Sequence, residues 1–435
     1  GGLRQASRGL PPHGMPARAG GLRHTIGCIL TIIAVYALKS IILLQNPNPL
    51  FIKYYDYLIP LIVSGIFFLV YEVWLKNFYN VTIAIFLKET FQRILILIFL
   101  VLFMLKLLKF ESLTFMYMLS VFVPSLLLLF FIASKGFLPL QLSTPKISKE
   151  LRTEMISVGL FYILSGISVN INVNIDKIML NSLMNMSAGG VYATAALFGV
   201  LVSAPSRPLK KITSIKLAEF WKEDNFKGLE DVYYKSVMTQ SVIGGLLMLG
   251  ILVNIDNIFQ FLPHEYKSGK WVVVFICITN FLEMASGASS SLLLTSKKYK
   301  SSAYMSILLL GLLIGLNFIF IPIYGLDGAA FATLIAFLIF HVMRSYYIYH
   351  HYKLLPYKKS FYILLLLTAT IYFLVSSLSF NLHFIIDMFI KGTAVCILFI
   401  PSVYILSISD DINNIIDMFL KKIKHVFEKN LPFNK

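Results

Sequence analysis

The sequence predicts an all-α polytopic membrane protein, and three observations support this fold class. Of the 435 residues, 57% are hydrophobic and only 14% are charged, whereas soluble domains carry about 25% charged residues. The apolar residues lie in runs of about 18 or more, which is the length that a membrane-spanning helix needs. The basic residues are concentrated in alternate connections between these runs. Because lipid offers no hydrogen bonds to the backbone, we expect each run to form a helix.

The apolar runs predict about twelve transmembrane helices. Four of them, the third, sixth, seventh and tenth, are short. In chain order the runs are Thr25–Leu44, Tyr54–Leu75, Phe91–Leu108, Leu113–Ala133, Met155–Leu180, Ala188–Ala204, Val237–Val253, Trp271–Leu294, Ala303–Ile321, Gly328–Met343, Phe361–Leu378 and Phe384–Leu406.

The net charge of +17 is explained by membrane topology and does not require a nucleic-acid partner. If both termini are cytoplasmic, the inward segments hold most of the 38 Lys and Arg residues, and outward loops such as "IYGLDG" and "FNLH" hold none. This is the positive-inside pattern. It predicts an even number of spans with both termini in the cytoplasm, and basic loops that attract anionic lipids of the inner leaflet.

The sequence shows no pattern typical of an enzyme. Cys28, Cys277 and Cys396 all lie in apolar runs, without the spacing of a metal site or a disulfide framework. No nucleophile–base pair or phosphate-binding glycine loop is present, and histidines such as His341 have no ligand partners at a useful spacing. We therefore expect no catalytic residue, no metal and no cofactor.

Composition divides the chain into six segments. Residues 1–24 have no apolar core, so they are interpreted as a disordered or foreign stretch and not as a signal peptide. The other expected segments are an N-terminal lobe of four helices (25–133), a cytoplasmic interlobe linker (134–154), a C-terminal lobe of six helices (155–349), two extra C-terminal helices (350–406) and a cytoplasmic amphipathic tail (407–435).

The fifth run ends in "SVNINVNIDKIML", which is unusually polar for a transmembrane helix. Each residue of a helix turns by about 100°, so two opposite stripes form. They contain Gly166, Asn170, Asn174 and Lys177 on one side, and Ser165, Ser168, Asn172 and Asp176 on the other. Because polar residues at membrane depth tend to mark substrate pathways, we expect one stripe to face a central aqueous cavity. The alternative is that the amides and serines only hold helices together.

Three stretches resemble a known family. They are "NIDKIMLNSLMNMSAGGVYATAALFGVLVSAP", "IPIYGLDGAAFATLIAF" and "YYDYLIPLIVSGIFFLVYEVWLKN". They are similar to the bacterial polysaccharide (O-antigen type) flippases of the multidrug/oligosaccharidyl-lipid/polysaccharide exporter superfamily. The resemblance covers about Thr25 to Leu406 and is carried by diffuse motifs, D-[KR]-x-M-L followed by G-[IV]-Y, and P-x-[YF]-G-x-x-G-A-A.

The resemblance implies a fold and an activity. Family members have two six-helix lobes around a central cavity, often followed by two further helices. They are thought to move undecaprenyl-pyrophosphate-linked oligosaccharides across the bacterial inner membrane by alternating access. Only four runs precede the expected linker here, so the first two helices of the family are expected to be absent and the first lobe to expose apolar surface.

The expected function is therefore a flippase for lipid-linked oligosaccharides, working with anionic lipids and with other polysaccharide-assembly proteins. The alternatives are an ion-coupled multidrug exporter of the same superfamily and a membrane polysaccharide polymerase. A pyrophosphate head requires cations, and sugar hydroxyls suit amides. The candidate substrate-binding residues are Lys39, Arg93, Asn170, Asn174, Lys177, Arg207 and Lys211, and the candidates for ion coupling are Asp176 and Glu283.

Overall fold

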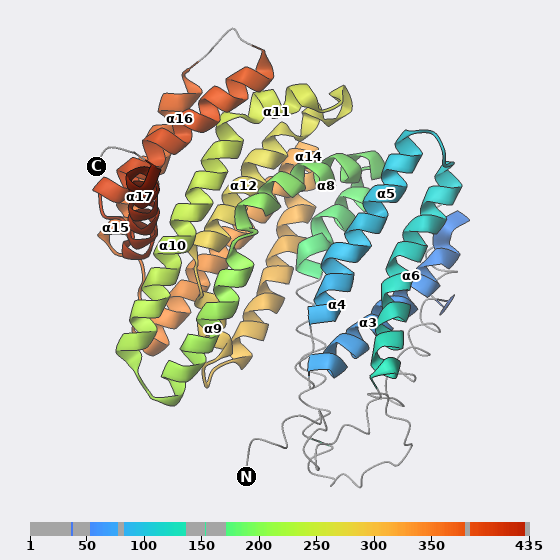
Figure 1. Cartoon of the computed structure of the whole chain (residues 1–435), viewed down its shortest axis with the longest axis horizontal. Helices are drawn as coiled ribbons and strands as arrows, with labels where there is room; N and C mark the ends of the chain where they lie inside the picture. The colour runs from blue at the N-terminus through green and yellow to red at the C-terminus, as the bar shows by residue number, and fades with distance from the viewer. Residues whose placement is uncertain are drawn as a thin grey trace. The chain divides into compact units, whose positions relative to one another are not determined.

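The structure, a computed structural model, describes residues 36–37, 53–76, 82–135, 153, 171–378 and 383–430. All regular elements in these ranges are helices, which confirms the all-α fold class (Figure 1). Eight of the described helices are long and apolar enough to cross a membrane. The chain divides into two compact units, Gly1–Thr153 and Glu154–Lys435. Most of the first and of the fifth apolar run lies outside the described residues, so the total number of spans and the segment bounds stay predictions.

The described part of the first unit is built from three longer helices. α6 (Phe110–Ser134) packs against α3 (Leu58–Lys76) and α5 (Gln92–Met104). A short 3-10 turn (Tyr55–Tyr57) precedes α3, and α4 (Thr82–Phe86) continues through a π-helical turn (Leu87–Phe91) into α5. The third apolar run is therefore the second half of a helix that already begins at Thr82. The core between the helices contains Phe68, Leu75, Leu87, Leu128 and Ile132.

The second unit is organised around α12 (Lys270–Ala285), which packs against α8 (Met186–Ser203), α10 (Phe226–Val253) and α14 (Lys300–Tyr352). α10 in turn contacts α15, α16 and the preceding helix α9. The remaining described helices are residues 171–183, α9 (Ser206–Lys222), α11 (Ile255–Phe261), a 3-10 helix (His264–Gly269), α13 (Ser289–Leu294), α15 (Lys359–Ser376), α16 (Phe384–Ile405) and α17 (Asp410–Asn430).

Two glycines interrupt apolar runs of this unit. Gly287 has a φ of +55° between α12 and α13, so the eighth run forms two helices and not one. Gly325 has a φ of +59° inside α14. Asn317 and Thr333 on either side of it bond to the same carboxylate, although 16 residues of straight helix would separate them by about 24 Å. α14 is therefore two helices that reverse direction at Gly325, where the sequence predicts the loop "IYGLDG".

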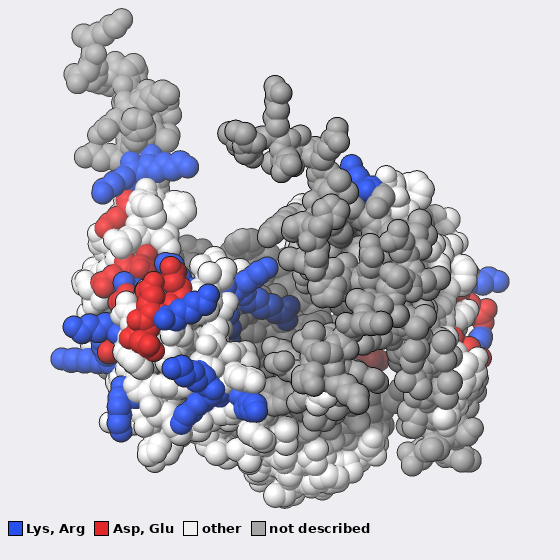
Figure 2. Space-filling view, turned by 90° about the horizontal axis from the view of Figure 1, so that it is seen from below, with Lys and Arg blue, Asp and Glu red and all other residues white. Residues whose placement is uncertain are grey.

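The α9–α10 hairpin closes one end of the second unit. Its turn contains Asp224, in the left-handed region at φ +48°, and the Asn225 side chain, which accepts a hydrogen bond from the backbone of Gly228 at 2.9 Å. Figure 2 views the chain from this end, and basic side chains of the second unit are spread there around a smaller acidic group. The positive-inside pattern predicts that this basic end lies in the cytoplasm.

Candidate functional site

Two clusters of polar side chains are enclosed by the apolar helices of the second unit. The Asp176 cluster consists of Asp176, Tyr192, Asn317 and Thr333. The Glu283 cluster consists of Lys210, Glu283, His341 and Arg344. Polar groups inside a membrane fold are costly unless they are paired, so these two clusters are the candidate functional site.

The Asp176 cluster joins four helical segments: residues 171–183, α8 and the two halves of α14. Asp176 is only 6% exposed, and its Oδ1 accepts a hydrogen bond from Asn317 Nδ2 at 2.7 Å. Its Oδ2 accepts from the Tyr192 hydroxyl at 2.8 Å and from the Thr333 hydroxyl at 2.8 Å. Tyr192 belongs to α8, whereas Asn317 and Thr333 come from the two halves of α14. The turn at Gly325 is what brings the last two together.

The Asp176 carboxyl group has neutral hydrogen-bond donors and forms no ion pair within the described part of the chain. The neighbouring Lys177 ammonium is directed to Asn174 Oδ1 at 3.4 Å. The buried Asn317 Oδ1 has no hydrogen-bond partner among the described residues. An isolated buried carboxylate is strongly disfavoured, so this arrangement suits a group that holds a proton or a cation. The described residues contain no group of three or more His, Cys, Asp or Glu side chains that could hold a metal ion.

The two polar stripes of the fifth run have different surroundings where they are described. Asp176 and Asn172 face other helices, since Asn172 Nδ2 donates to the backbone oxygen of Ser306 at 3.3 Å. Asn174 is exposed and Lys177 is half-buried on the other stripe. This division is the one expected for a helix between neighbouring helices and a cavity, and the cavity itself stays a prediction.

The Glu283 cluster ties the amphipathic helix α9 to α12 and α14. Lys210 of α9 forms an ion pair with Glu283 Oε1. Glu283 Oε2 lies 3.4 Å from His341 Nε2 and 3.7 Å from Arg344 Nη2. Arg344 Nη2 also lies 2.8 Å from His341 Nδ1, and its guanidinium carbon is 4.5 Å from the ring centroid of Phe340. One carboxylate is thus shared by two permanent cations and an imidazole.

The Glu283 cluster is largely screened from solvent. The side chains of His341 and Arg344 are each 7% exposed, that of Lys210 17% and that of Glu283 28%. Arg344 Nη2 donates to the Ser286 hydroxyl at 3.3 Å. The cluster is suited to hold α9 in place through the Lys210–Glu283 ion pair, which is lost if α9 moves, whereas the contacts of Glu283 with His341 and Arg344 join α12 to α14.

The other candidate residues do not gather at these clusters. Arg93 is exposed and pairs with Glu89 one helical turn away at 2.5 Å, as a local surface pair does. Arg207 and Lys211 are exposed on α9. Lys39 and Asn170 lie outside the described residues. No contact brings Arg93 or Arg207 to a buried acidic group in the described part of the chain.

Sequence reasoning missed most partners in both clusters. Asn317, Thr333 and Tyr192 were not distinguished from other polar residues, because their partner Asp176 is 16 to 157 residues away. Arg344 directly follows the tenth apolar run, where the positive-inside pattern alone accounts for a basic residue. The available signal was His341 and Arg344, three residues apart and on one face of a helix that continues to Tyr352.

No protein-family model and no curated protein matches the sequence of the chain. Solved structures do match its fold. The lipid II flippase MurJ in an inward closed conformation superposes with a TM-score of 0.68 at 16% identity, covering 88% of this chain and 82% of that chain. A proline-to-alanine mutant of a MATE protein gives 0.55 at 18% identity, covering 78% of each.

A third match is the Vibrio cholerae MATE transporter VcmN in the bent form, with a TM-score of 0.51 at 15% identity over 77% of this chain and 78% of that chain. At such low identities the comparisons establish the fold and not the substrate. The chain therefore has the fold of multi-pass transporters of the MurJ and MATE type.

Proposed function

We propose that the chain is an exporter of the multidrug/oligosaccharidyl-lipid/polysaccharide superfamily that moves lipid-linked oligosaccharide units across the bacterial inner membrane by alternating access. The observation that carries this proposal is the match to the MurJ fold, with a TM-score of 0.68 over 88% of the chain. The MATE folds match less of the chain, with TM-scores of 0.55 and 0.51. The resemblance of "NIDKIMLNSLMNMSAGGVY" to polysaccharide flippases supports the same substrate class.

The proposed ligands of the pyrophosphate group are basic side chains that form no ion pair with a buried acidic residue among the described residues. Arg207 and Lys211 remain exposed on α9, while Lys210 between them is paired with Glu283. Lys177 and Asn174 share the exposed stripe of residues 171–183. Lysine and arginine bind phosphate through charge-assisted hydrogen bonds, and the Asn174 amide suits a sugar hydroxyl.

The second candidate function is an ion-coupled multidrug exporter, and the Asp176 cluster favours it. A buried carboxyl group that is not held in an ion pair can take up and release a proton or a monovalent cation as its surroundings change. We propose Asp176 as the coupling group in either function. Glu283 is less suited to this role because Lys210 and Arg344 already neutralise it.

Leaflet-resolved analysis of lipid-linked oligosaccharides in cells lacking the gene tests the substrate. Accumulation of intact units on the cytoplasmic face, reversed by the wild-type gene, is the expected result. Normal translocation of the units together with sensitivity to cationic dyes would support the multidrug exporter instead. Units that are translocated but not polymerised would support a polymerase.

The coupling role is tested by Asp176→Asn, which keeps the shape of the side chain and removes its charge. Coupling free energies between sites correspond to about 5- to 150-fold, so we expect transport to fall at least about fivefold and to lose its dependence on the ion gradient. The matched control is Asp224→Asn in the exposed α9–α10 turn. Imposing a proton or a sodium gradient on proteoliposomes identifies the ion. Undiminished gradient-driven transport by Asp176→Asn would exclude the role.

A further inference from the structure

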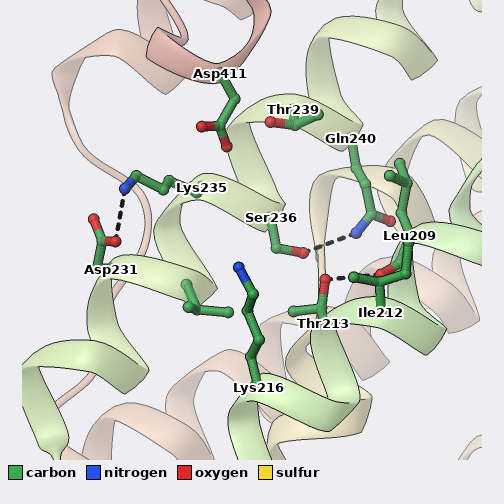
Figure 3. A pocket seen from close by; sticks show the side chains of 11 residues that line it. Leu209, Ile212, Thr213, Lys216, Asp231, Lys235, Ser236, Thr239, Gln240 and Asp411 are labelled. Atoms are coloured by element: carbon green, nitrogen blue, oxygen red, sulfur yellow. Dashed lines mark hydrogen bonds and ion pairs between the residues drawn. The ribbon is translucent and has the colours of Figure 1, made fainter.

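A cavity of about 270 Å³ lies between α9, α10 and the first turn of α17 (Figure 3). It is slightly smaller than the roughly 300–1,000 Å³ of pockets for drug-sized ligands, so it suits a small group. Its walls carry charged and hydroxyl side chains together with aliphatic ones. They are Leu209, Ile212, Thr213 and Lys216 of α9, Asp231, Val232, Lys235, Ser236, Thr239 and Gln240 of α10, and Asp411 of α17.

The cavity lies along the α9–α10 hairpin, beyond the turn that joins the two helices. A Cβ on Gly228 would lie 3.0 Å from the ring of Phe220, so the helices are in contact there. Towards the other end, Lys210 of α9 is engaged by Glu283 of α12, not by α10. Between these two positions the cavity is lined by both helices and by Asp411 at the start of α17.

Two side chains of opposite charge face the cavity from its two sides. Lys216 projects from α9 and Asp411 from α17, as Figure 3 shows. Neither makes a hydrogen bond or ion pair with the part of the chain that the structure describes, whereas Lys235 is paired with Asp231 at 2.7 Å. The site is neutral in total but bipolar, with an available cation on one side and an available carboxylate on the other.

Buried polar atoms of the wall also lack partners among the described residues. Gln240 is 1% exposed, and its Oε1 accepts no hydrogen bond from them. The same holds for the buried Thr239 hydroxyl within these ranges. Gln240 Nε2 donates to the Ser236 hydroxyl at 2.8 Å, so the Ser236 hydrogen is left to donate. Since an unsatisfied buried polar atom is destabilising, these atoms indicate a polar ligand with both donors and acceptors.

The surroundings indicate that this ligand belongs to a membrane lipid. Ile212 and Ile215 of α9 are 62% and 68% exposed, and Met418 and Phe419 of α17 are 61% and 64% exposed. Apolar residues on one side of a helix with basic residues elsewhere are typical of helices at the membrane interface. The positive-inside pattern places this end of the unit at the cytoplasmic leaflet.

We propose that the cavity binds the headgroup of a phospholipid with a phosphate and a primary ammonium group, such as phosphatidylethanolamine. The phosphate is bound by Lys216 and the Ser236 hydroxyl, and the ammonium group by Asp411 and Gln240 Oε1. A headgroup with net negative charge would lie beside the Asp411 carboxylate with only Lys216 to balance both, since Lys235 is already paired with Asp231. The proposal does not depend on which substrate the chain exports.

Native mass spectrometry of the purified full chain tests the proposal, with added phosphatidylethanolamine, phosphatidylcholine or phosphatidylglycerol of identical acyl chains. We expect phosphatidylethanolamine to bind about tenfold more tightly than the other two. Asp411→Asn should abolish its advantage over phosphatidylcholine, because a quaternary ammonium donates no hydrogen bond. Lys216→Gln should weaken all three lipids. Asp410→Asn and Lys222→Gln, exposed neighbours outside the cavity, should change nothing.

With free phosphoethanolamine added as a fourth ligand, the same experiment can overturn the proposal in three ways. Preferential binding of phosphatidylglycerol would show an anion site. An unchanged lipid preference in Asp411→Asn, with a melting temperature equal to that of the wild type, would exclude the ammonium contact. Free phosphoethanolamine that binds as tightly as the lipid would assign the cavity to a soluble ligand.

Discussion

Replacing Glu283 by glutamine should destabilise the second unit strongly, because it removes the carboxylate that the Glu283 cluster shares. The substitution keeps the size of the side chain and leaves Lys210 and Arg344 close together without this counter-ion. At an effective dielectric constant of 20, a charge pair at about 4 Å is worth about 4 kcal/mol before desolvation is subtracted. Removing one partner of a buried ion pair typically costs about 3–5 kcal/mol.

The exposure of the cluster sets the expected value within that range. The Glu283 side chain is 28% exposed and that of Lys210 is 17% exposed, so water screens part of the interaction. We therefore expect Glu283→Gln to lower the free energy of unfolding by about 3 kcal/mol, the lower end of the range. Lys210→Gln should cost less than about 1 kcal/mol, because Glu283 and Arg344 then form a balanced pair.

The assay is reversible unfolding in mixed micelles of both single variants and of the double variant. The double variant should be more stable than Glu283→Gln, since removing Lys210 relieves the repulsion between two unpaired cations. The reasoning would be refuted if Lys210→Gln cost as much as Glu283→Gln, or if the double variant were the least stable of the three.

Two further predictions concern packing and hydrogen bonding. Gly287→Ala places a Cβ at 2.7 Å from Val237 Cγ2 at a φ of +55°, so the melting temperature of this variant should fall by an amount equivalent to about 3 kcal/mol. The control is Gly250→Ala, which has no atom within 4 Å of the added Cβ among the described residues and should be neutral or stabilising. Equal melting temperatures of the two variants would contradict the strain at Gly287. Asn317→Ala should lower the free energy of unfolding by about 2 kcal/mol, and by more than Thr333→Val does in the same assay. Asn317 is the donor to Asp176 Oδ1, whereas Oδ2 has two donors. A larger decrease in Thr333→Val would contradict this assignment.

The fold was predictable where it depends on local hydrophobicity. Runs such as Tyr54–Leu75 and Phe384–Leu406 correspond to described helices within a few residues, because only helices satisfy the backbone in lipid. At Gly287 the sequence predicts one continuous span, whose small residues suit close packing or a hinge, and the structure has two helices there. The residues around it, "ASGASSS", are as apolar or small as those of a continuous span, and the close approach of Val237, 2.7 Å from where a Cβ of Gly287 would lie, arises only from tertiary packing.

The candidate site was only half predictable, for a different reason. Asp176 and Glu283 were recognisable because a carboxylate in an apolar run is rare and costly. Their partners Asn317 and Arg344 are unremarkable in the sequence, and only tertiary packing brings them within reach. Lys216 and Asp411 could not be paired from the sequence for the same reason, because they line one cavity although they are 195 residues apart in the chain.

The long sequence separation within the Asp176 cluster has a consequence for synthesis of the protein. Asn317 and Thr333 follow Asp176 by 141 and 157 residues. At about 5–20 residues per second, a ribosome needs on the order of 10 s to produce them. During that time the only partner of the Asp176 cluster already synthesised is Tyr192, which follows Asp176 by 16 residues. Membrane insertion of this helix must therefore either wait for α14 at the translocation machinery or proceed with the carboxyl group protonated.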